Sequence, residues 1–236
     1  MKRLTPLLLA CAISVATTVP ATARDLVVVE LFTSQGCSSC PPADALLTDL
    51  AKRNDVLALS LHVDYWDYIG WKDPFADPAN TQRQRAYARQ FGLGYVYTPQ
   101  MVVDGRAQMT GSNRPAVLRG IDRAKDASGL AVGLKRDGDT ISVSLPNGGT
   151  DGTAAVYAVL FDREHVTDVR RGENRGRKLA YSNVVRDMER VATWRGEALT
   201  LPLNGLPTGG RDACAIIIQS ERTGQILGSA VIDLKS

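Results

Sequence analysis

Apolar runs separated by short polar breaks predict alternating strands and helices in the first half of the chain. Residues 26–32 and 55–63 are apolar and rich in β-branched side chains, which is typical of strands buried on both faces. Between them, three leucines share one face of a helix predicted over residues 44–51. A strand, a helix and a strand at this spacing indicate two parallel neighbours joined by a right-handed crossover, so both strands should end at the same edge of a sheet.

The same half continues with two more helices and a short strand. Asn80 is the expected N-cap of a helix over residues 81–90, and a final helix is predicted over residues 115–127. Between these helices, Pro99 directly precedes a strand over residues 100–103. Because proline has no N–H group to donate to a strand ladder, a proline at this position often marks a cis peptide bond.

Beyond Gly129 the apolar residues form short strands separated by glycine-rich turns. Strands are predicted over residues 129–136, 140–145, 153–161 and 213–219. Regular short strands with such turns predict a small antiparallel β-sandwich. We therefore expect an α/β chain with a first domain over residues 24–128 and a second over residues 129–236.

The first residues have the pattern of a secretory signal peptide. Two basic residues precede an apolar run over residues 4–19, and Ala21-Thr-Ala23 fits a cleavage site. The run is too short for a stable membrane span. Cys11 also fits a lipoprotein cleavage box, but the apolar run continues well past it. We expect residues 1–23 to be removed, which leaves a periplasmic or secreted protein without a membrane span.

Composition and charge narrow the classes of partner. The chain has 236 residues, of which 44% are apolar and 22% charged, as in ordinary globular proteins. Without Lys2 and Arg3, the 28 basic residues fall to 26 against 25 acidic ones, a net charge near +1. No basic patch is interleaved with aromatic residues, so we expect no nucleic-acid partner.

A C-x-x-C pair, Cys37 and Cys40, lies between the first strand and the first helix. The unpaired N–H groups and the dipole of a helix N-terminus stabilise a thiolate there. Cys37, expected to be the more exposed thiol, is the predicted nucleophile, and Cys40 the thiol that resolves the mixed disulfide. A structural disulfide that closes so short a loop would add little stability, and a zinc site would need a second pair of ligands.

The pair predicts a thiol–disulfide oxidoreductase that needs no cofactor. Its partners would be a protein substrate with thiols or a disulfide and a separate redox partner. One alternative is a copper- or other metal-binding module that uses Cys37, Cys40 and His62, although the cysteine spacing is the redox one. Another alternative is a binding protein that keeps the fold without the chemistry.

Three further polar residues are candidates for supporting roles. His62 and Asp64 share a face at the end of the second strand, beside the expected position of the C-x-x-C turn. His62 either shuttles a proton for a thiol or is a packed histidine bonded to a backbone carbonyl. Glu30, an acid within an apolar strand, is either a proton relay behind Cys40 or the partner of a lysine or arginine.

Three other features are open to interpretation. Residues 65–78 form an aromatic loop that either binds an unfolded peptide or packs as a lid. Arg170–Arg177 is a charged loop that either binds an anion or a partner or is a solvated hairpin turn. Cys214, in an apolar strand, is expected to be a buried, inert thiol without a disulfide.

Residues 25–128 resemble the thioredoxin fold in the order of their elements, their C-x-x-C pair and the proline before the third strand. In thioredoxin-like oxidoreductases the residue before this proline and the proline itself face the cysteine pair and bind the extended backbone of the substrate. The resemblance implies that role for Thr98 and Pro99. No tryptophan precedes Cys37, and two prolines follow Cys40, which leaves the direction of electron flow open.

The segments Glu30–Asp44 and His62–Asp67 are more closely similar to a family of secreted thioredoxin-like proteins known as domain of unknown function 1223. The resemblance extends over most of the chain that follows the signal peptide. It implies a thioredoxin-like fold and export, and it supplies no substrate.

Overall fold

The computed structural model describes residues 26–127, 129–150 and 152–235. The predicted signal peptide lies outside these residues. In chain order the elements are β1 (Val27–Thr33), α1 (Pro41–Ala51), β2 (Val56–His62), the 3-10 turn η1 (Asp67–Ile69), α2 (Pro78–Gln90), β3 (Gln100–Val103), β4 (Ala107–Thr110), α3 (Arg114–Lys125), β5 (Gly133–Asp137), β6 (Thr140–Leu145), β7 (Ala154–Asp168), β8 (Lys178–Trp194), β9 (Leu199–Leu203), β10 (Ala213–Ser220) and β11 (Ile226–Asp233).

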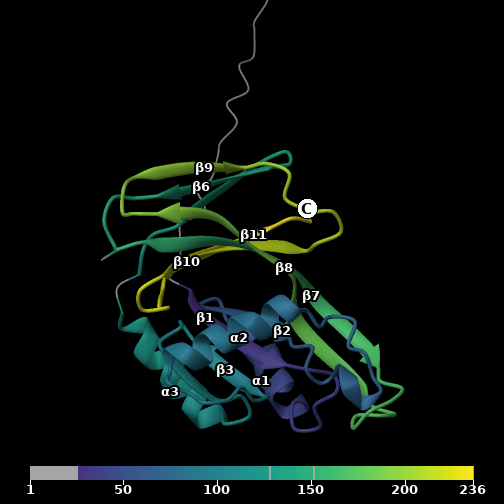
Figure 1. Cartoon of the computed structure of the whole chain (residues 1–236). Coiled ribbons are helices and arrows are strands. Elements are labelled where there is room, and N and C mark those ends of the chain that lie inside the picture. Colours follow the sequence, from purple (N-terminus) through teal and green to yellow (C-terminus); the bar gives the residue numbers. More distant parts are fainter. Residues whose placement is uncertain (1–25, 128, 151, 236) are drawn as a thin grey trace, which may run out of the picture.

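The main sheet has eight strands in the order β11-β10-β7-β8-β2-β1-β3-β4 (Figure 1). β1 and β2 are parallel neighbours, as their spacing predicts, and Thr33 at the end of β1 lies opposite His62 at the end of β2. β8 also runs parallel to β2, where Ser60 pairs with Val184. The other neighbouring strands of the sheet are antiparallel.

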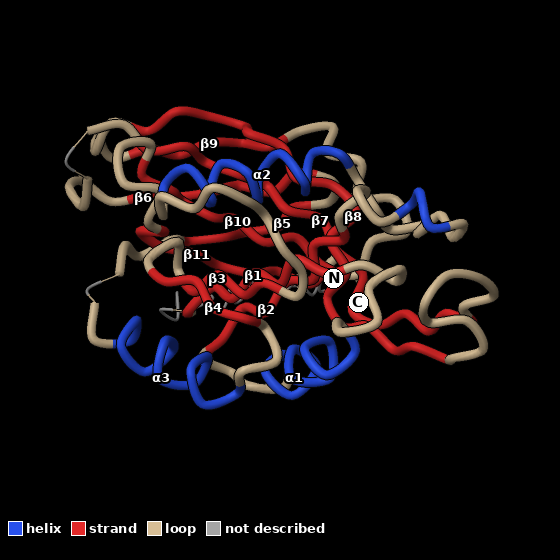
Figure 2. Tube along the Cα trace, turned by 60° about the horizontal axis from the view of Figure 1, so that its bottom comes forward, coloured by secondary structure: helices blue, strands red, loops and turns tan. Residues whose placement is uncertain are grey.

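Helices cover both faces of the β1–β2–β3 part of this sheet, with α1 and α3 on one face and α2 on the other (Figure 2). The side chains of β1 alternate between the two faces. Val29 and Leu31 pack with residues of α1 and α3, whereas Val28 and Phe32 pack on the side of Tyr87 from α2. All seven residues of β1 are buried, which confirms a strand covered on both faces.

β5, β6 and β9 form a second, smaller antiparallel sheet. Its apolar side chains, such as Val143, pack against Ile216 of β10 and Leu160 of β7, and Trp194 is fully buried in the same cluster. The fold is therefore mixed α/β with a small antiparallel sheet, in agreement with the coarser expectation. β7 and β10, however, do not belong to a separate sandwich sheet but extend the sheet of the first half. The domain boundary between residues 128 and 129 stays a prediction.

β7 and β8 are 15 and 17 residues long and form an antiparallel ribbon. The ribbon extends past the main sheet, and its far end lies beside α1 (Figure 1). Ser182 of β8 donates a hydrogen bond to Thr48 of α1 over 3.0 Å. The sequence pattern predicts the first half of β7 and misses β8, because charged residues interrupt the apolar alternation of both strands beyond residue 161.

The expected N-cap of α2 is wrong. The helix begins at Pro78, and Asp77 is its N-cap, with Oδ1 accepting a hydrogen bond from the Ala79 N–H group at 2.7 Å. Asn80 is instead buried and donates its side-chain amide to the His62 carbonyl at 2.9 Å. In the part of the chain that the structure describes, no helix is long and apolar enough to cross a membrane.

Candidate functional site

Cys37 and Cys40 are joined by a disulfide at the start of α1. Their Cα atoms lie 5.4 Å apart, and Cys40 is the N-cap residue of the helix. The Cys40 carbonyl accepts hydrogen bonds from the N–H groups of Ala43 and Asp44 at 2.8 and 3.1 Å. The pair therefore occupies the strand-to-helix position that the sequence predicts, where the helix dipole stabilises a thiolate.

Neither cysteine side chain is accessible to solvent. Cys37 and Cys40 are both 0% exposed, so the expectation that Cys37 is the more exposed thiol is wrong. The exposed residues of the turn are Ser38 and Ser39. Two segments distant in sequence contact this turn. Their positions in the fold cannot be predicted from sequence spacing.

The first covering element is residues 169–177 between β7 and β8, here called the hairpin tip. The buried side-chain amide of Asn174 donates to the carbonyl oxygens of Gln35 and Cys37, at 3.0 and 2.9 Å. Glu173 accepts a hydrogen bond from the Ser38 N–H group at 3.0 Å. The charged loop therefore forms hydrogen bonds with the backbone of the cysteine turn at Gln35, Cys37 and Ser38.

The second covering element is the aromatic loop, residues 65–78. The indole N–H group of Trp71 donates to Oε1 of Gln35 at 2.8 Å, and Oδ2 of Asp73 accepts from the Gln35 N–H group at 2.8 Å. A Cβ atom at Gly36 would lie 3.1 Å from Ile69 Cδ1, and one at Gly172 would lie 3.3 Å from the same atom. Ile69 thus packs between the cysteine turn and the hairpin tip, in agreement with the prediction of a loop over this edge.

Buried polar side chains come together from α1, the ends of β1 and β2, the aromatic loop and β8. They form a group called here the buried polar cluster: Thr33, Asp44, His62, Asp73 and Tyr181. The Thr33 hydroxyl donates to Oδ1 of Asp44 at 2.8 Å, and Nδ1 of His62 lies 2.7 Å from Oδ2 of Asp73. The rings of His62 and Tyr181 are 4.7 Å apart. Among the described residues, His62 Nε2 and the Tyr181 hydroxyl have no hydrogen-bond partner.

The two carboxyl groups of the buried polar cluster have opposite pKa shifts. Burial raises the pKa of Asp44 to about 7, although the charge of His62 and the Thr33 hydrogen bond oppose this rise. Burial would also raise the pKa of Asp73, but the charge and hydrogen bond of His62 outweigh it and hold this pKa below its usual value. Asp44 is therefore the carboxyl group of the cluster that exchanges a proton near neutral pH.

His62 and Asp64 do not act on one another. Asp64 accepts a hydrogen bond from the Thr81 hydroxyl at 2.5 Å, at the start of α2. His62 is fully buried at the edge of the sheet beside the C-x-x-C turn, as the strand topology predicts, and its partner is Asp73. Its backbone carbonyl, not its ring, accepts from Asn80.

Glu30 has a cationic partner, which matches the second of its two interpretations. Its carboxylate accepts hydrogen bonds from Arg83 at 2.5 and 3.0 Å and from the Tyr87 hydroxyl at 2.5 Å. Glu30 alternates with Leu31 along β1 and lies on the α2 side of the sheet, whereas α1 and Asp44 lie on the other side. Asp44, and not Glu30, is the buried carboxyl group on the helix of Cys40.

The Thr98–Pro99 peptide bond is cis, as the proline before β3 predicts. Pro99 is buried close to the first turn of α1, because a Cβ atom at Gly111 would lie 3.0 Å from Ala43 Cβ and 3.2 Å from Pro99 Cβ. The Thr98 hydroxyl accepts a hydrogen bond from the Trp66 indole at 2.8 Å. Thr98 and Pro99 therefore lie between the aromatic loop and the N-terminal end of α1.

The metal-binding alternative gains no support. Within residues 26–127, 129–150 and 152–235, no group of three or more histidine, cysteine or acidic side chains has the arrangement of a metal site. Cys214 is a free, buried thiol, as expected, and burial raises its pKa to about 11.

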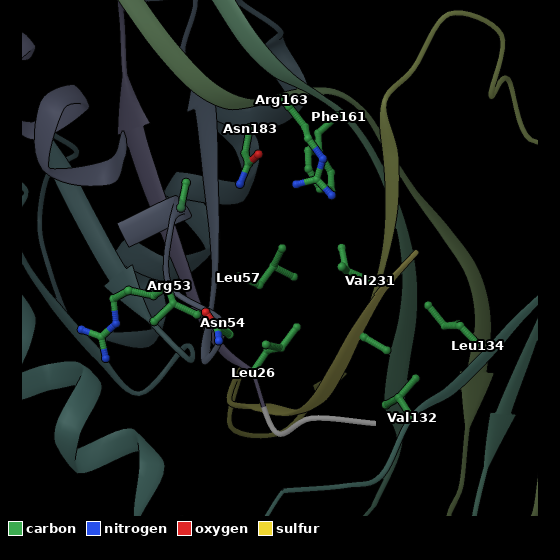
Figure 3. Close-up of a pocket in the computed structure, with 13 residues that line it drawn as sticks. Leu26, Arg53, Asn54, Leu57, Val132, Leu134, Phe161, Arg163, Asn183 and Val231 are labelled. Carbon is green, nitrogen blue, oxygen red and sulfur yellow. The ribbon is translucent and has the colours of Figure 1, made fainter. Parts of the chain in front are cut away.

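Two cavities lie away from the disulfide. One of about 270 Å³ opens where β8 diverges from β2, with apolar walls that include Leu26, Leu57 and Val231 and with Arg163 and Asn183 at one end (Figure 3). The other, of about 700 Å³, lies between α2 and the strands β7 and β10. Neither is lined by Cys37 or Cys40.

Comparison with known proteins decides the family. The sequence model of DUF1223, a protein family of unknown function, matches residues 28–219. The chain belongs to the DUF1223 family. No curated protein matches it.

Solved structures resemble this DUF1223 chain over most of its length. The crystal structure of protein AGR_C_4864 from Agrobacterium tumefaciens is 35% identical, with a TM-score of 0.76 over 90% of this chain and 96% of that one. HBP35 of Porphyromonas gingivalis has a TM-score of 0.60 over 91% of this chain and 77% of that one. At 13% identity, this second likeness concerns the fold alone.

Sequence patterns in the DUF1223 chain miss three residues of the site. Asp44 is placed at the start of a helix without a role, Asp73 is part of the aromatic loop, and Asn174 is part of the charged loop. One signal was available for Asp44, because a residue four positions after Cys40 lies on the same face of the helix. For Asp73 and Asn174 no local signal exists, because the groups that they bind are distant in sequence.

Proposed function

We propose that this protein is an exported thiol–disulfide oxidoreductase of thioredoxin-like fold, with Cys37 and Cys40 as its reacting pair. The observation that carries the proposal is the Cys37–Cys40 disulfide at the N-terminus of α1, with the buried carboxyl group of Asp44 one turn further along the helix. A helix N-terminus favours a thiolate, and a carboxyl group with a pKa of about 7 can exchange its proton.

The thioredoxin-like part of the proposal rests on topology. β1, α1 and β2 form a parallel unit, α2 follows, and β3 is antiparallel to β1 and begins after the cis Thr98–Pro99 bond. Export is supported by the signal pattern of residues 1–23 and by the disulfide, which is typical of oxidising compartments.

The proposed reaction has two exchange steps. In the oxidising direction, a substrate thiolate attacks Sγ of Cys37, the Cys37–Cys40 bond breaks, and Cys40 leaves as a thiolate. A second substrate thiolate attacks the substrate sulfur of the mixed disulfide and releases Cys37 as a thiolate. The substrate loses two electrons and the cysteine pair gains them, so an oxidised thiol–disulfide partner has to restore the pair. The reducing direction runs the same steps in reverse.

Asp44 is the proposed proton donor and acceptor for Cys40. Residues four positions apart lie on one helix face, and both Cys40 and Asp44 are buried. When the disulfide opens, the Asp44 carboxyl group gives its proton to the Cys40 thiolate. When Cys40 attacks the mixed disulfide, the Asp44 carboxylate takes the proton back. The backbone of Thr98 and the ring of Pro99 are the proposed contacts of the substrate.

A redox titration of the purified protein in glutathione buffers tests the proposal directly. Free thiols are trapped at each buffer composition and counted by mass spectrometry. We expect a reversible two-electron transition of the pair, together with exchange on a peptide disulfide. Cys37→Ser should lose this exchange by at least about 100-fold, and Cys40→Ser should accumulate the mixed disulfide. Cys214→Ser is the matched control, because its thiol is buried and forms no disulfide. A Cys37→Ser variant with full exchange activity would overturn the proposal.

A further inference from the structure

We propose that the hairpin tip is the docking surface for the protein substrate, and that this substrate is acidic beside its reacting thiol or disulfide. This inference rests on the proposed exchange chemistry of Cys37 and Cys40, and it adds the place and the charge of the binding surface.

The position of the hairpin tip is the first support. Asn174 and Glu173 bond directly to Cys37 and Ser38, so the residues on either side of them border the turn that carries the disulfide. A partner whose sulfur reaches Cys37 therefore reacts at a turn to which the hairpin tip is directly hydrogen-bonded.

The charge of this segment is the second support. Residues 168–178 hold five cationic and two acidic side chains, a net charge of +3, whereas the chain without residues 1–23 has a net charge near +1. The rest of the chain is therefore negative on balance. The cationic side chains of the segment are all exposed: Arg170, Arg171, Arg175, Arg177 and Lys178.

These cationic groups are not neutralised locally. Arg177 donates to the amide oxygen of Asn174 at 2.9 Å, and none of the five forms an ion pair with a described residue. Of the two acids, Glu173 already accepts from the Ser38 N–H group, and Asp168 lies across the strand pair from Lys178. The free positive charge is available for the carboxylates of a bound protein.

Exposed apolar side chains accompany the charge. Tyr68 is 82% exposed in the aromatic loop, next to Ile69, which packs against Gly36 and Gly172. Val166 is 58% exposed on β7, three residues before the hairpin tip. Tyrosine and arginine are among the side chains enriched at the centres of protein interfaces, which favours a protein as the bound partner.

The physical consequence is electrostatic steering of the reacting partner. Unpaired surface charges of one sign raise the association rate of an oppositely charged partner by about 10- to 1000-fold at low salt. The effect falls as salt shortens the Debye length from about 10 Å at 0.1 M to about 3 Å at 1 M. The rate of exchange should therefore depend on the charge of residues that flank the sulfur of the substrate.

Three peptides of one length provide the test. Each has a central cysteine linked to thiopyridine, a neutral leaving group with an absorbance signal, and the cysteine is flanked by glutamate, glutamine or lysine. With the reduced full protein at low salt, we expect the glutamate peptide to react at least about 10-fold faster than the lysine peptide. The difference should disappear at 1 M salt.

Charge reversal locates the effect on the molecule. Arg170→Glu, Arg171→Glu and Arg175→Glu together should abolish or invert the preference, measured as the ratio of each rate to that of the glutamine peptide. The matched control reverses three exposed arginines on α2 and α3, Arg89, Arg119 and Arg123, with the same change in net charge, and should keep the preference. If the glutamate triple variant fails to fold, the glutamine triple variant should reduce the preference.

The outcomes separate this inference from the proposed function. Equal rates for all three peptides, or a preference that the tip variants keep, would overturn the docking surface and leave the exchange chemistry intact. No reaction with any peptide, the neutral one included, would overturn the proposed function itself. A preference lost equally in the control variant would show a general effect of net charge and would also overturn the docking surface.

Discussion

The side-chain amide of Asn174 lies 2.9 Å from the carbonyl oxygen of Cys37, although the two residues are 137 positions apart. The same amide reaches the Gln35 carbonyl at 3.0 Å, and Asn174 is 1% exposed. One buried side chain therefore holds the end of the β7–β8 ribbon against the turn that carries the disulfide.

Asn174→Ala should make the disulfide easier to reduce in the native protein. The change removes the donor of the buried Gln35 carbonyl and leaves the Cys37 carbonyl with the Cys40 N–H group alone, at 3.2 Å. An unpaired buried polar group costs about 1–3 kcal/mol in a protein interior. The hairpin tip should then separate more readily, and 1.4 kcal/mol corresponds to about a tenfold change in an equilibrium. We expect reduction by dithiothreitol to be about tenfold faster, measured by trapping free thiols over time without denaturant.

A distant core variant controls for general destabilisation. Val143→Ala removes buried apolar contacts in the small sheet, far from the disulfide in the fold, at a comparable cost in stability. Its reduction rate should stay at the wild-type value. If both variants accelerate reduction equally, the disulfide is reached through global unfolding, and Asn174 does not control access.

Asp44 should make the protein less stable as the pH rises through the neutral range. Its pKa is about 7 in the folded protein against 3.8 for an ordinary aspartate, so between these values the folded state binds more protons than the unfolded state. The free energy of unfolding therefore falls as the pH rises from about 4 to about 7. At 1.36 kcal/mol per pKa unit, the total change is on the order of 4 kcal/mol.

Asp44→Asn removes this pH dependence, because the amide does not ionise and still offers an oxygen to the Thr33 hydroxyl. Urea unfolding of the oxidised proteins at pH 4, 5.5, 7 and 8 gives the free energy of unfolding at each pH. This free energy should increase for the variant relative to the wild type as the pH rises. Asp49→Asn, an exposed carboxylate on the same helix, is the control. The same slope in Asp44→Asn and the wild type would contradict a raised pKa at this position.

Cys214 should react with iodoacetamide only when the protein unfolds. Cys214 is 0% exposed, so iodoacetamide cannot reach its thiol in the folded protein. Burial also raises the pKa of this thiol to about 11, so it is not ionised at pH 8. Mass measurement of the oxidised protein should show no alkylation without denaturant and a single alkylated thiol in urea. Rapid native alkylation would show that β10 opens locally.

The first half of the fold could be predicted because each of its elements has its own local pattern. The apolar runs of β1 and β2 and the leucines of α1 report burial without any knowledge of distant contacts. β8 has no such pattern: its apolar alternation is broken by Arg186, Asp187 and Glu189. Its pairing with β2, more than a hundred residues earlier, depends on long-range contacts that spacing does not encode.

The residues of the candidate site also divide into those that local patterns predict and those that they do not. Cys37, Cys40 and the cis Thr98–Pro99 bond follow from short motifs, and the place of His62 follows from the topology of two parallel strands. The hydrogen-bond partners of these residues do not follow from any local pattern. Asp73 and Asn174 reach the site only after the aromatic loop and the β7–β8 ribbon have folded over it, and the burial of Asp44 depends on neighbours from both.

Glu30→Gln should destabilise the protein and leave the disulfide chemistry unchanged. Arg83 is nearly buried, with 11% of its side chain exposed, and Glu30 is its anionic partner. Removing one member of a buried ion pair leaves an uncompensated charge, which typically costs about 3–5 kcal/mol. We expect a loss of this size in the free energy of unfolding by urea at pH 7. Arg53→Gln, which breaks the half-exposed pair with Asp55, is the control and should cost at most about 1 kcal/mol.

The same variant decides between Glu30 and Asp44 as the carboxyl group that serves Cys40. Glu30 lies on the α2 side of the sheet, so Glu30→Gln should keep the wild-type pH profile of peptide exchange in the folded protein. Asp44→Asn should lose the part of that profile that titrates near pH 7, because the proton of Cys40 then has no acceptor on α1. If Glu30→Gln flattens the profile and Asp44→Asn does not, the relay crosses the sheet, and the role assigned here to Asp44 is wrong.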